Sequence, residues 1–183
     1  MSRQGYSFQN DWFSGNIPLF TRHLGGLRNE VCSVIEIGCH EGRATTWLLD
    51  NILTNPGSRI TCIDKVVQEN FWPNIGIAQG YNKVQLLVGN SRDVLRKLPL
   101  SEAGFIYIDG SHSAVDVLED AVLSFRLAKI GAVIAFDDYL WNDTQYSDGS
   151  TPKPAIDAFL TIYQRRLEVL EMGYQVWIRK LSD

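Results

Sequence analysis

The chain has 183 residues, of which 45% are hydrophobic and 21% charged, and its formal net charge is −4. The composition is that of a globular protein, and the length predicts a single domain over residues 1–183, with an N-terminal cap helix region (1–30) and a core (31–183). The acidic balance argues against a nucleic-acid partner, because nucleic-acid-binding surfaces normally carry a clustered basic patch.

The first thirty residues carry apolar side chains at roughly helical spacing and lack the apolar segment of a signal peptide. We expect this stretch to pack as the cap helix. Its apolar face would consist of Trp12, Phe13, Ile17, Phe20, Leu24 and Leu27. No later segment approaches the roughly 18 apolar residues that span a membrane. We therefore expect a soluble, cytoplasmic protein with no membrane partner, and leave a homodimer open.

Apolar runs of strand length alternate with amphipathic segments of helix length along the rest of the chain. The expected strands are Val31 to Gly38, Arg59 to Asp64, Lys83 to Gly89, Phe105 to Asp109 and Ala132 to Asp138. The expected helices are Arg43 to Leu53, Ser91 to Leu98, Ser113 to Leu127 and Pro154 to Tyr163. Because the strand runs are nearly continuous in apolar residues, both of their faces should be covered. The alternation predicts a parallel sheet wound by right-handed crossovers.

The end of the chain departs from this alternation. The segment Leu167 to Lys180 has two strand-like halves that meet at Met172 and Gly173, which is a hairpin signal with a tight glycine turn. We therefore expect an α/β, Rossmann-like fold. Its mostly parallel, seven-stranded sheet should carry helices on both faces and finish in a C-terminal antiparallel hairpin.

Several side chains that could carry chemistry are given structural roles. The cysteines form no Cys-x-x-Cys pair and predict reduced thiols, not a disulfide framework or a zinc site. They are Cys32, Cys39 and Cys62. Three acids of the helix after the fourth strand are expected to form a solvated face. They are Asp116, Glu119 and Asp120.

Polar residues and glycines stand at the ends of all five predicted parallel strands. They are Glu36 to Gly42, Asp64, Gly89 to Ser91, Asp109 and the pair Asp137 and Asp138. Ligands of open α/β sheets bind beyond the carboxyl ends of the strands. Any one of these residues could simply end a strand, but five ends that behave alike predict one binding site.

The segment VIEIGCHEG resembles the first motif of class I methyltransferases, in which an acidic residue and a spacer precede glycines that open a helix. The resemblance extends from Val31 to Lys180, closing hairpin included. It implies that Gly38 and Gly42 shape a loop under the methionine part of S-adenosylmethionine, and that Glu36 faces the ammonium group of this cofactor. His40 stands where the motif often has a glycine.

Asp64 and the segment after the third strand complete the predicted cofactor site. The Asp64 carboxylate can accept two hydrogen bonds from a ribose diol, a feature that dinucleotide-binding proteins share. However, GCHEG is not the GxGxxG fingerprint for a pyrophosphate, which ranks an NAD-linked oxidoreductase lower. The resemblance places Ser91 and Asn90 near the adenine and counts Asp109 among the cofactor-binding residues.

Three carboxylates should meet at one edge of the pocket, because the fourth and fifth strands are neighbours in the family's sheet. Asp109 follows the fourth strand, and Asp137 and Asp138 follow the fifth. Like charges so close together are costly unless they are neutralised, and an oxygen-rich cluster suits Mg²⁺ or a similar hard cation. The arrangement resembles metal-dependent O-methyltransferases, both the catechol type and the type that acts on macrolide sugars. The resemblance implies that these three residues hold a divalent metal.

His112 stands three residues after Asp109, where the macrolide-sugar type places a histidine as the base and the catechol type has a lysine. A bound cation lowers the pKa of a hydroxyl, and a neutral imidazole can accept its proton. We therefore predict His112 and Asp109 as catalytic residues in the metal-assisted O-methylation of a small hydroxylated molecule. The competing interpretation is that His112 only caps the following helix.

A polar loop from Tyr139 to Pro154 carries aromatic residues that could stack on the methyl acceptor, as lid loops do. They are Tyr139, Trp141 and Tyr146. Two rival functions stay open. One is a metal-independent methyltransferase in which Asp137 and Asp138 only orient the substrate. The other is a non-catalytic module that binds S-adenosylmethionine.

Overall fold

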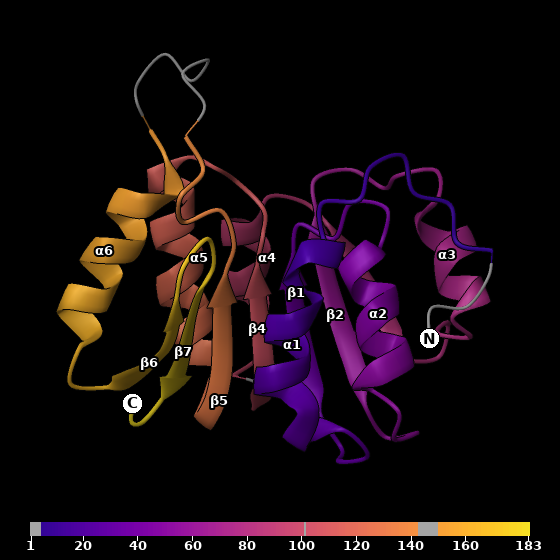
Figure 1. The fold of residues 1–183 in the computed structure, drawn as a ribbon, viewed down its shortest axis with the longest axis horizontal. Coiled ribbons are helices and arrows are strands. Elements are labelled where there is room, and N and C mark those ends of the chain that lie inside the picture. Colours follow the sequence, from indigo (N-terminus) through magenta and orange to yellow (C-terminus); the bar gives the residue numbers. More distant parts are fainter. Residues whose placement is uncertain (1–4, 101, 143–149) are drawn as a thin grey trace.

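A computed structural model describes residues 5–100, 102–142 and 150–183 of the chain. The strands are β1 (Ser33–Ile37), β2 (Arg59–Asp64), β3 (Val84–Val88), β4 (Ala103–Ile108), β5 (Ala128–Phe136), β6 (Leu167–Met172) and β7 (Val176–Lys180). They form one seven-stranded sheet in the order β3-β2-β1-β4-β5-β7-β6 (Figure 1). β1 to β5 are parallel, and β7 runs antiparallel to both β5 and β6. The predicted Rossmann-like sheet with its closing hairpin is confirmed.

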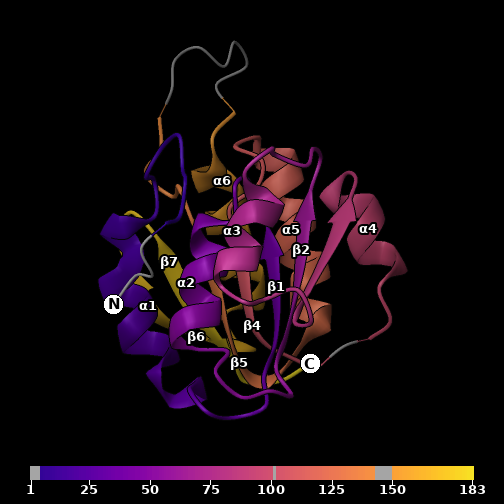
Figure 2. The same ribbon diagram turned by 90° about the vertical axis from the view of Figure 1, so that its right-hand side faces the viewer.

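Helices cover both faces of the sheet, as predicted. They are α1 (Ile17–Leu24), α2 (Arg43–Asn51), α3 (Phe71–Ile77), α4 (Ser91–Lys97), α5 (Ala114–Leu127) and α6 (Pro152–Tyr163), with 3₁₀ turns η1 (Ser14–Asn16) and η2 (Gly25–Leu27). α1, α2 and α3 lie on one face, and α4, α5 and α6 lie on the other (Figure 2). No helix in the described part of the chain is long and apolar enough to cross a membrane.

The N-terminal region caps one face of the sheet, but its helix is shorter than the sequence suggests. Phe20 of α1 is fully buried, and its ring meets those of Tyr107 and Trp177 edge-on, with centroids 5.0 Å away in each case. This aromatic contact fixes α1 across the middle of the sheet. Trp12 is the exception to the predicted apolar face: it precedes α1 and is 71% exposed.

Two elements differ from the sequence expectation. α3 was not expected, because its seven residues include Pro73 and Gly76, both of which are poor helix formers. β5 begins at Ala128 and not at Ala132. The sequence did not indicate this start, because Lys129 and Gly131 interrupt the apolar run and residues 129–131 are exposed. The register shift between Ala103 and Phe105 of β4 accommodates this irregular start.

Asp120 corrects the expectation of a solvated acidic face on α5, because its side chain is only 1% exposed. Among the described residues, neither of its carboxylate oxygens has a hydrogen-bond partner. Burial raises the pKa of Asp120 to about 6, against a smaller opposing effect of the nearby Ser91 hydroxyl. A buried carboxyl group that lacks a strong partner opposes folding once it is ionised.

Asp120→Asn should remove this penalty. Since the pKa of Asp120 is higher in the folded chain than its ordinary value of 3.8, the folded state binds the proton more tightly. The ionisation penalty therefore grows between about pH 4 and pH 6.5 and then stays near 3 kcal/mol. Urea unfolding at pH 4.5 and pH 8 measures it. The variant should lose less stability than the wild type over this interval, and an identical loss in both proteins would contradict the assignment.

Candidate active site

The loop between β1 and α2, which is predicted to bind the cofactor, packs directly on the residues that follow β4. The Gly38 N–H donates to the Ile63 carbonyl at 2.8 Å, and the Asp109 N–H donates to the Ile37 carbonyl at 2.8 Å. Gly38 has φ +85°, and a Cβ atom on it would lie 1.9 Å from the Asp109 carbonyl oxygen. Only glycine permits this approach. The loop and the first predicted catalytic acid are therefore fixed relative to each other.

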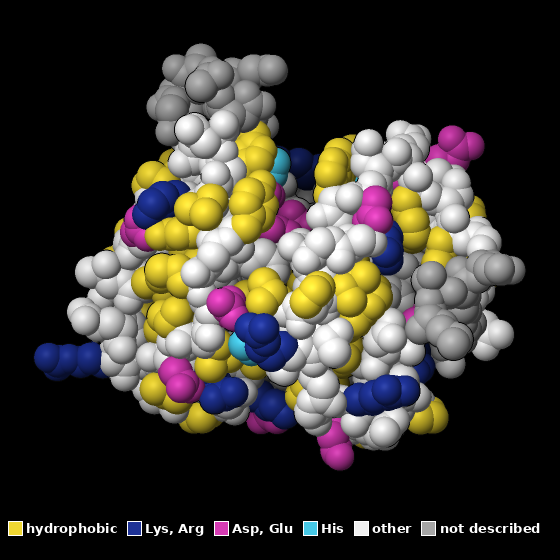
Figure 3. Space-filling view, in the orientation of Figure 1, with side chains coloured by type: hydrophobic (Ala, Val, Ile, Leu, Met, Phe, Trp, Pro, Cys, Tyr) yellow, Lys and Arg dark blue, Asp and Glu magenta, His cyan; other side chains and the backbone are white. Residues whose placement is uncertain are grey.

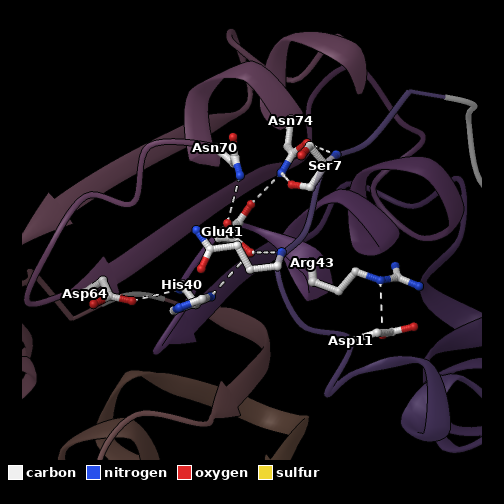
Figure 4. A network of polar contacts seen from close by, with 9 residues as sticks. Ser7, Asp11, His40, Glu41, Arg43, Asp64, Asn70 and Asn74 are labelled. Carbon is white, nitrogen blue, oxygen red and sulfur yellow. Dashed lines mark hydrogen bonds and ion pairs between the residues drawn. The ribbon is translucent and has the colours of Figure 1, made fainter.

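Asp64 at the end of β2 is held in place by the same loop. The His40 N–H donates to Asp64 Oδ2 at 2.8 Å (Figure 4), and the Val66 N–H lies 3.3 Å from Asp64 Oδ1. His40 itself adopts a positive φ of 45° in this loop. The carboxylate predicted to bind a ribose diol is thereby oriented before any ligand arrives.

Glu41, whose role was not foreseen, joins the N-terminal segment to this loop. Its side chain accepts hydrogen bonds from the Gln9 N–H at 2.7 Å and the Asn70 amide at 2.9 Å. Asn74 donates to the Glu41 carbonyl at 3.0 Å (Figure 4). The side chain of Glu41 is only 3% exposed. These contacts join three segments far apart in the sequence, which is why the sequence pattern did not reveal them.

Glu36, the acidic residue of the motif, is buried at the end of β1. The Thr45 hydroxyl donates to its Oε2 at 2.6 Å. Burial raises the pKa of Glu36 to about 7, and the charge of Asp64 contributes in the same direction. A cationic neighbour would stabilise the charged form of this buried carboxyl group and lower its pKa.

A cavity of about 580 Å³ lies beyond the carboxyl ends of the parallel strands, within the usual size range of small-molecule sites. Figure 3 shows the hollow at the upper edge of the molecule, with acidic side chains inside it. The predicted residues that line it are Gly38, Asp64, Ser91, Asp109, His112, Asp137 and Asp138. Gly42 and Asn90, the residues that precede α2 and α4, do not line it. Glu36 lines a smaller adjoining cavity.

Other residues that line the main cavity were not predicted to be site residues. They include Trp12, His40, Lys65, Asp116 and Tyr174. Asp116 accepts a hydrogen bond from the Ser111 hydroxyl at 2.8 Å. Trp12 and Tyr174 reach the cavity from segments far away in the sequence, which no local pattern identifies. His40, Lys65 and Asp116 stand beside predicted site residues in the sequence. Trp141, which the sequence suggested as an acceptor contact, also lines it.

Asp137 is the most constrained of the three carboxylates. Its Oδ2 accepts hydrogen bonds from the Tyr107 hydroxyl, from the Asn16 amide at 3.0 Å and from the Gln175 amide at 3.0 Å. Burial raises the pKa of Asp137, and the charge of Asp138 raises it further. The N-terminal region, β4 and the C-terminal hairpin therefore each contribute a hydrogen bond to one carboxylate.

Asp109 lies beside this pair at the end of β4. Burial raises its pKa well above the usual range, and the charges of Asp137 and Asp138 add to the effect. Three carboxylates that repel one another offer the oxygen donors that a hard cation prefers. Within residues 5–100, 102–142 and 150–183, however, no group of three His, Cys, Asp or Glu side chains is arranged to hold a metal ion. The donor chemistry fits a cation, which would replace some of the present hydrogen bonds.

His112 is paired with Asp138 across the cavity. Its Nε2 lies 2.9 Å from Asp138 Oδ2, and the Tyr174 hydroxyl donates to Asp138 Oδ1 at 3.0 Å. The His112 ring packs against Trp141, with ring centroids 4.2 Å apart. The N-cap position of α5 is occupied by Ser113 and not by His112. The carboxylate of Asp138 therefore fixes the orientation of the imidazole.

The aromatic residues of the predicted lid separate into different roles. Tyr139 is buried, and its hydroxyl donates to Asp157 at 2.7 Å, so it anchors α6 and does not face the acceptor. Trp141 lines the main cavity beside His112. Tyr146 lies outside the described residues.

Comparisons with known proteins identify the family of the chain. A family model described as a methyltransferase domain matches residues 35–139, more than half of the chain. A protein of Dictyostelium discoideum, described as probable caffeoyl-CoA O-methyltransferase 3, is 31% identical over 97 residues. That match covers 50% of this chain and 38% of the relative, so the chain matches well under half of the relative's length.

Solved structures share the fold at low sequence identity. An O-methyltransferase from Bacillus cereus in complex with S-adenosylhomocysteine (SAH) superposes with a TM-score of 0.70 at 18% identity, covering 97% of this chain and 84% of that chain. The MycE methyltransferase of mycinamycin biosynthesis, in complex with Mg, SAH and mycinamycin VI, has a TM-score of 0.68 at 13% identity, with coverages of 97% and 51%. From the family match and the shared fold, we conclude that the chain belongs to the family of methyltransferase domains, with the class I fold.

Proposed function

We propose that the protein is an S-adenosylmethionine-dependent O-methyltransferase that acts on a small hydroxylated molecule. The observation that carries the proposal is the His112–Asp138 pair, with 2.9 Å between Nε2 and Oδ2. It lines the same cavity as Gly38 and Asp64, the predicted cofactor residues. A base and a cofactor site in one cavity are what methyl transfer to a hydroxyl requires.

The roles of the residues follow from their positions. Gly38 and Asp64 would bind and orient the cofactor in the main cavity. His112, donating Nε2–H to Asp138, would take the proton of the acceptor hydroxyl on Nδ1. When bound, S-adenosylmethionine would supply the methyl group that the acceptor oxygen receives, and SAH would be the other product. Positioning of the two reactants supplies much of the rate.

A divalent cation is part of the proposal, with Asp109, Asp137 and Asp138 as the residues that would hold it. Such an ion lowers the pKa of a bound hydroxyl and fixes its position. The raised pKa values of Asp109 and Asp137 support a cationic partner at this place. MycE, a structure of the same fold, contains Mg.

Methyl transfer from labelled S-adenosylmethionine to a panel of hydroxylated metabolites tests the function. We expect product with at least one alcohol or phenol, loss of activity in EDTA, and recovery with excess Mg²⁺ or Mn²⁺. Activity that EDTA leaves unchanged would favour the metal-independent alternative. Tight binding of SAH without turnover on any member of the panel would favour the non-catalytic module.

Asp64→Ala should weaken SAH binding by about 1–3 kcal/mol, because two charge-assisted hydrogen bonds to the ribose are lost. Calorimetry of the wild type and the variant measures the difference. Glu69→Gln is a matched control, since it removes a negative charge from the exposed segment that follows β2. The ribose assignment fails if Asp64→Ala and Glu69→Gln bind SAH equally well.

A further inference from the structure

The first turn of α5, which directly follows His112, is not capped by its own N-cap residue. Ser113 occupies the N-cap position, but its side chain makes no cap hydrogen bond. The first N–H groups of an α-helix have no acceptor within the helix, so they need acceptors from elsewhere. The backbone next to His112 therefore depends on side chains that do not belong to α5.

Ser150, which lies just before α6, supplies one of these acceptors from a distant part of the chain. The Ala114 N–H donates to the Ser150 hydroxyl oxygen at 2.8 Å, although the two residues are 36 positions apart. The same hydroxyl donates to Ser113 Oγ at 3.4 Å. α6 lies beside α5 on the same face of the sheet (Figure 2), which brings Ser150 to this place. Ser150 thereby bonds the two residues that follow His112.

Trp141 contacts the imidazole of His112 itself. The two ring centroids are 4.2 Å apart, and the ring planes are tilted by 39°. The Trp141 N–H donates to the Asp138 carbonyl at 2.9 Å. This hydrogen bond ties Trp141 to the residue whose carboxylate lies 2.9 Å from His112 Nε2. A carboxylate and an indole ring that are fixed relative to each other therefore both contact the imidazole.

The position of His112 matters because the residue lies between β4 and α5 and belongs to neither element. A general base acts only within about 2.6–3.2 Å of the atom that carries its proton. A displacement of about 1 Å can lower a rate about 100-fold. The groups that hold the backbone and the ring of His112 therefore control how well it can act as a base.

We propose that Ser150 and Trp141 are positioning residues for His112. Ser150 fixes the backbone that follows the histidine, and Trp141 fixes its ring. The inference rests on the proposed function, because it takes His112 as the base. It also changes the role of Trp141, which the sequence suggested as a stacking partner of the acceptor.

Proton NMR tests the positioning without any substrate. The chain has three histidines, so the signal that disappears in His112→Ala identifies the Cε1–H of His112. In the wild type the ring current of Trp141 should shift this signal. Ser150→Ala should move or broaden it by several linewidths, and the signals of His23 and His40 should stay in place. An unchanged His112 signal in Ser150→Ala would overturn the proposal.

Thr151→Ala is the matched control for Ser150→Ala. Thr151 is the next residue in the chain, and its side chain makes no cap hydrogen bond to α6. The control variant loses a hydroxyl from the same segment but keeps the Ser150 bond to α5. It should leave all three histidine signals unchanged. Equal shifts of the His112 signal in the two variants would show that the cap from Ser150 does not position the histidine.

Kinetics then test whether the two residues act through the base. Ser150→Ala and Trp141→Leu should each lower kcat about 10-fold and change the KM for the acceptor less than about threefold. In a His112→Ala background neither change should lower kcat further, because the group that they position is gone. An equal fall in both backgrounds, or a higher acceptor KM with unchanged kcat, would overturn the proposal.

Ser150→Thr keeps a hydroxyl and should retain most of the wild-type kcat, whereas a loss as large as that of Ser150→Ala would count against the cap. If Ser150→Ala does not fold, the His112 signal and the kcat of Trp141→Leu in the two backgrounds decide in the same way. A wild type that methylates no acceptor would refute the proposed function. The NMR comparison still decides the positioning in that case.

Discussion

His112→Ala should lower turnover by about 10²- to 10⁴-fold, the usual effect of losing a general base. The imidazole is oriented by Asp138 at 2.9 Å and lines the cavity where the acceptor would bind. Initial rates with saturating S-adenosylmethionine and the best acceptor of the panel measure the effect. The affinity for SAH should barely change, because the histidine is assigned to the acceptor side.

Two further measurements separate a base from a packing residue. Added imidazole should restore part of the activity of His112→Ala, because it can accept the proton in the space that the side chain leaves. Asp138→Asn keeps the imidazole but loses its charged partner and one proposed metal ligand, so added imidazole should not restore the activity of this variant. If His112→Ala keeps most of its activity, the proton leaves by another route and the proposed mechanism is wrong.

Gly38→Ala should both destabilise the fold and abolish cofactor binding. The added Cβ would lie 1.9 Å from the Asp109 carbonyl oxygen and 2.7 Å from the Cα of Gly110, so backbone must move. Backbone strain at positive φ costs about 1–2 kcal/mol, and overpacking adds about 1–3 kcal/mol or more. A total near 3 kcal/mol corresponds to a melting temperature about 6–12 °C lower for a chain of this size.

Gly131→Ala is a matched control for the clash. Gly131 has φ +84°, close to the +85° of Gly38, but nothing lies within 4 Å of its added Cβ. It should therefore show the strain alone, with a smaller fall in melting temperature and unchanged affinity for SAH. Equal melting temperatures for the two variants would mean that the loop can move away from Asp109 with no further loss of stability.

The sheet and the carboxylates at its edge were predictable, because a strand covered on both faces is a nearly continuous run of apolar residues in the sequence. FIYID, for example, is a run that only a central strand would bury, and Asp109 at its end lines the cavity. The hairpin was equally visible, since its glycine separates two apolar halves. These features are local, so the order of residues alone is sufficient to predict them.

Other features depend on contacts between distant segments, which produce no local pattern in the sequence. Nothing near Asp120 in the sequence indicates that both of its oxygens are buried. Trp12 looked like one more residue of an apolar stripe, but it lines the cavity beside His40. The hydrogen bond from Asn16 to Asp137 joins residues 121 positions apart. Periodicity identifies which face of an element is apolar but not which distant polar side chain completes a site.

The insertion of β7 between β5 and β6 has a consequence for how the chain assembles during synthesis. Among the described strands β6 pairs only with β7, so it cannot join the sheet until β7 has left the ribosome. Until then the backbone of β5 is an open edge on an apolar strand, which is a template for pairing with other chains. Gln175, between β6 and β7, bonds Asp137 only when the hairpin docks. Docking of this hairpin therefore covers the open edge of β5 and, in the same step, adds the Gln175 hydrogen bond to the carboxylate cluster.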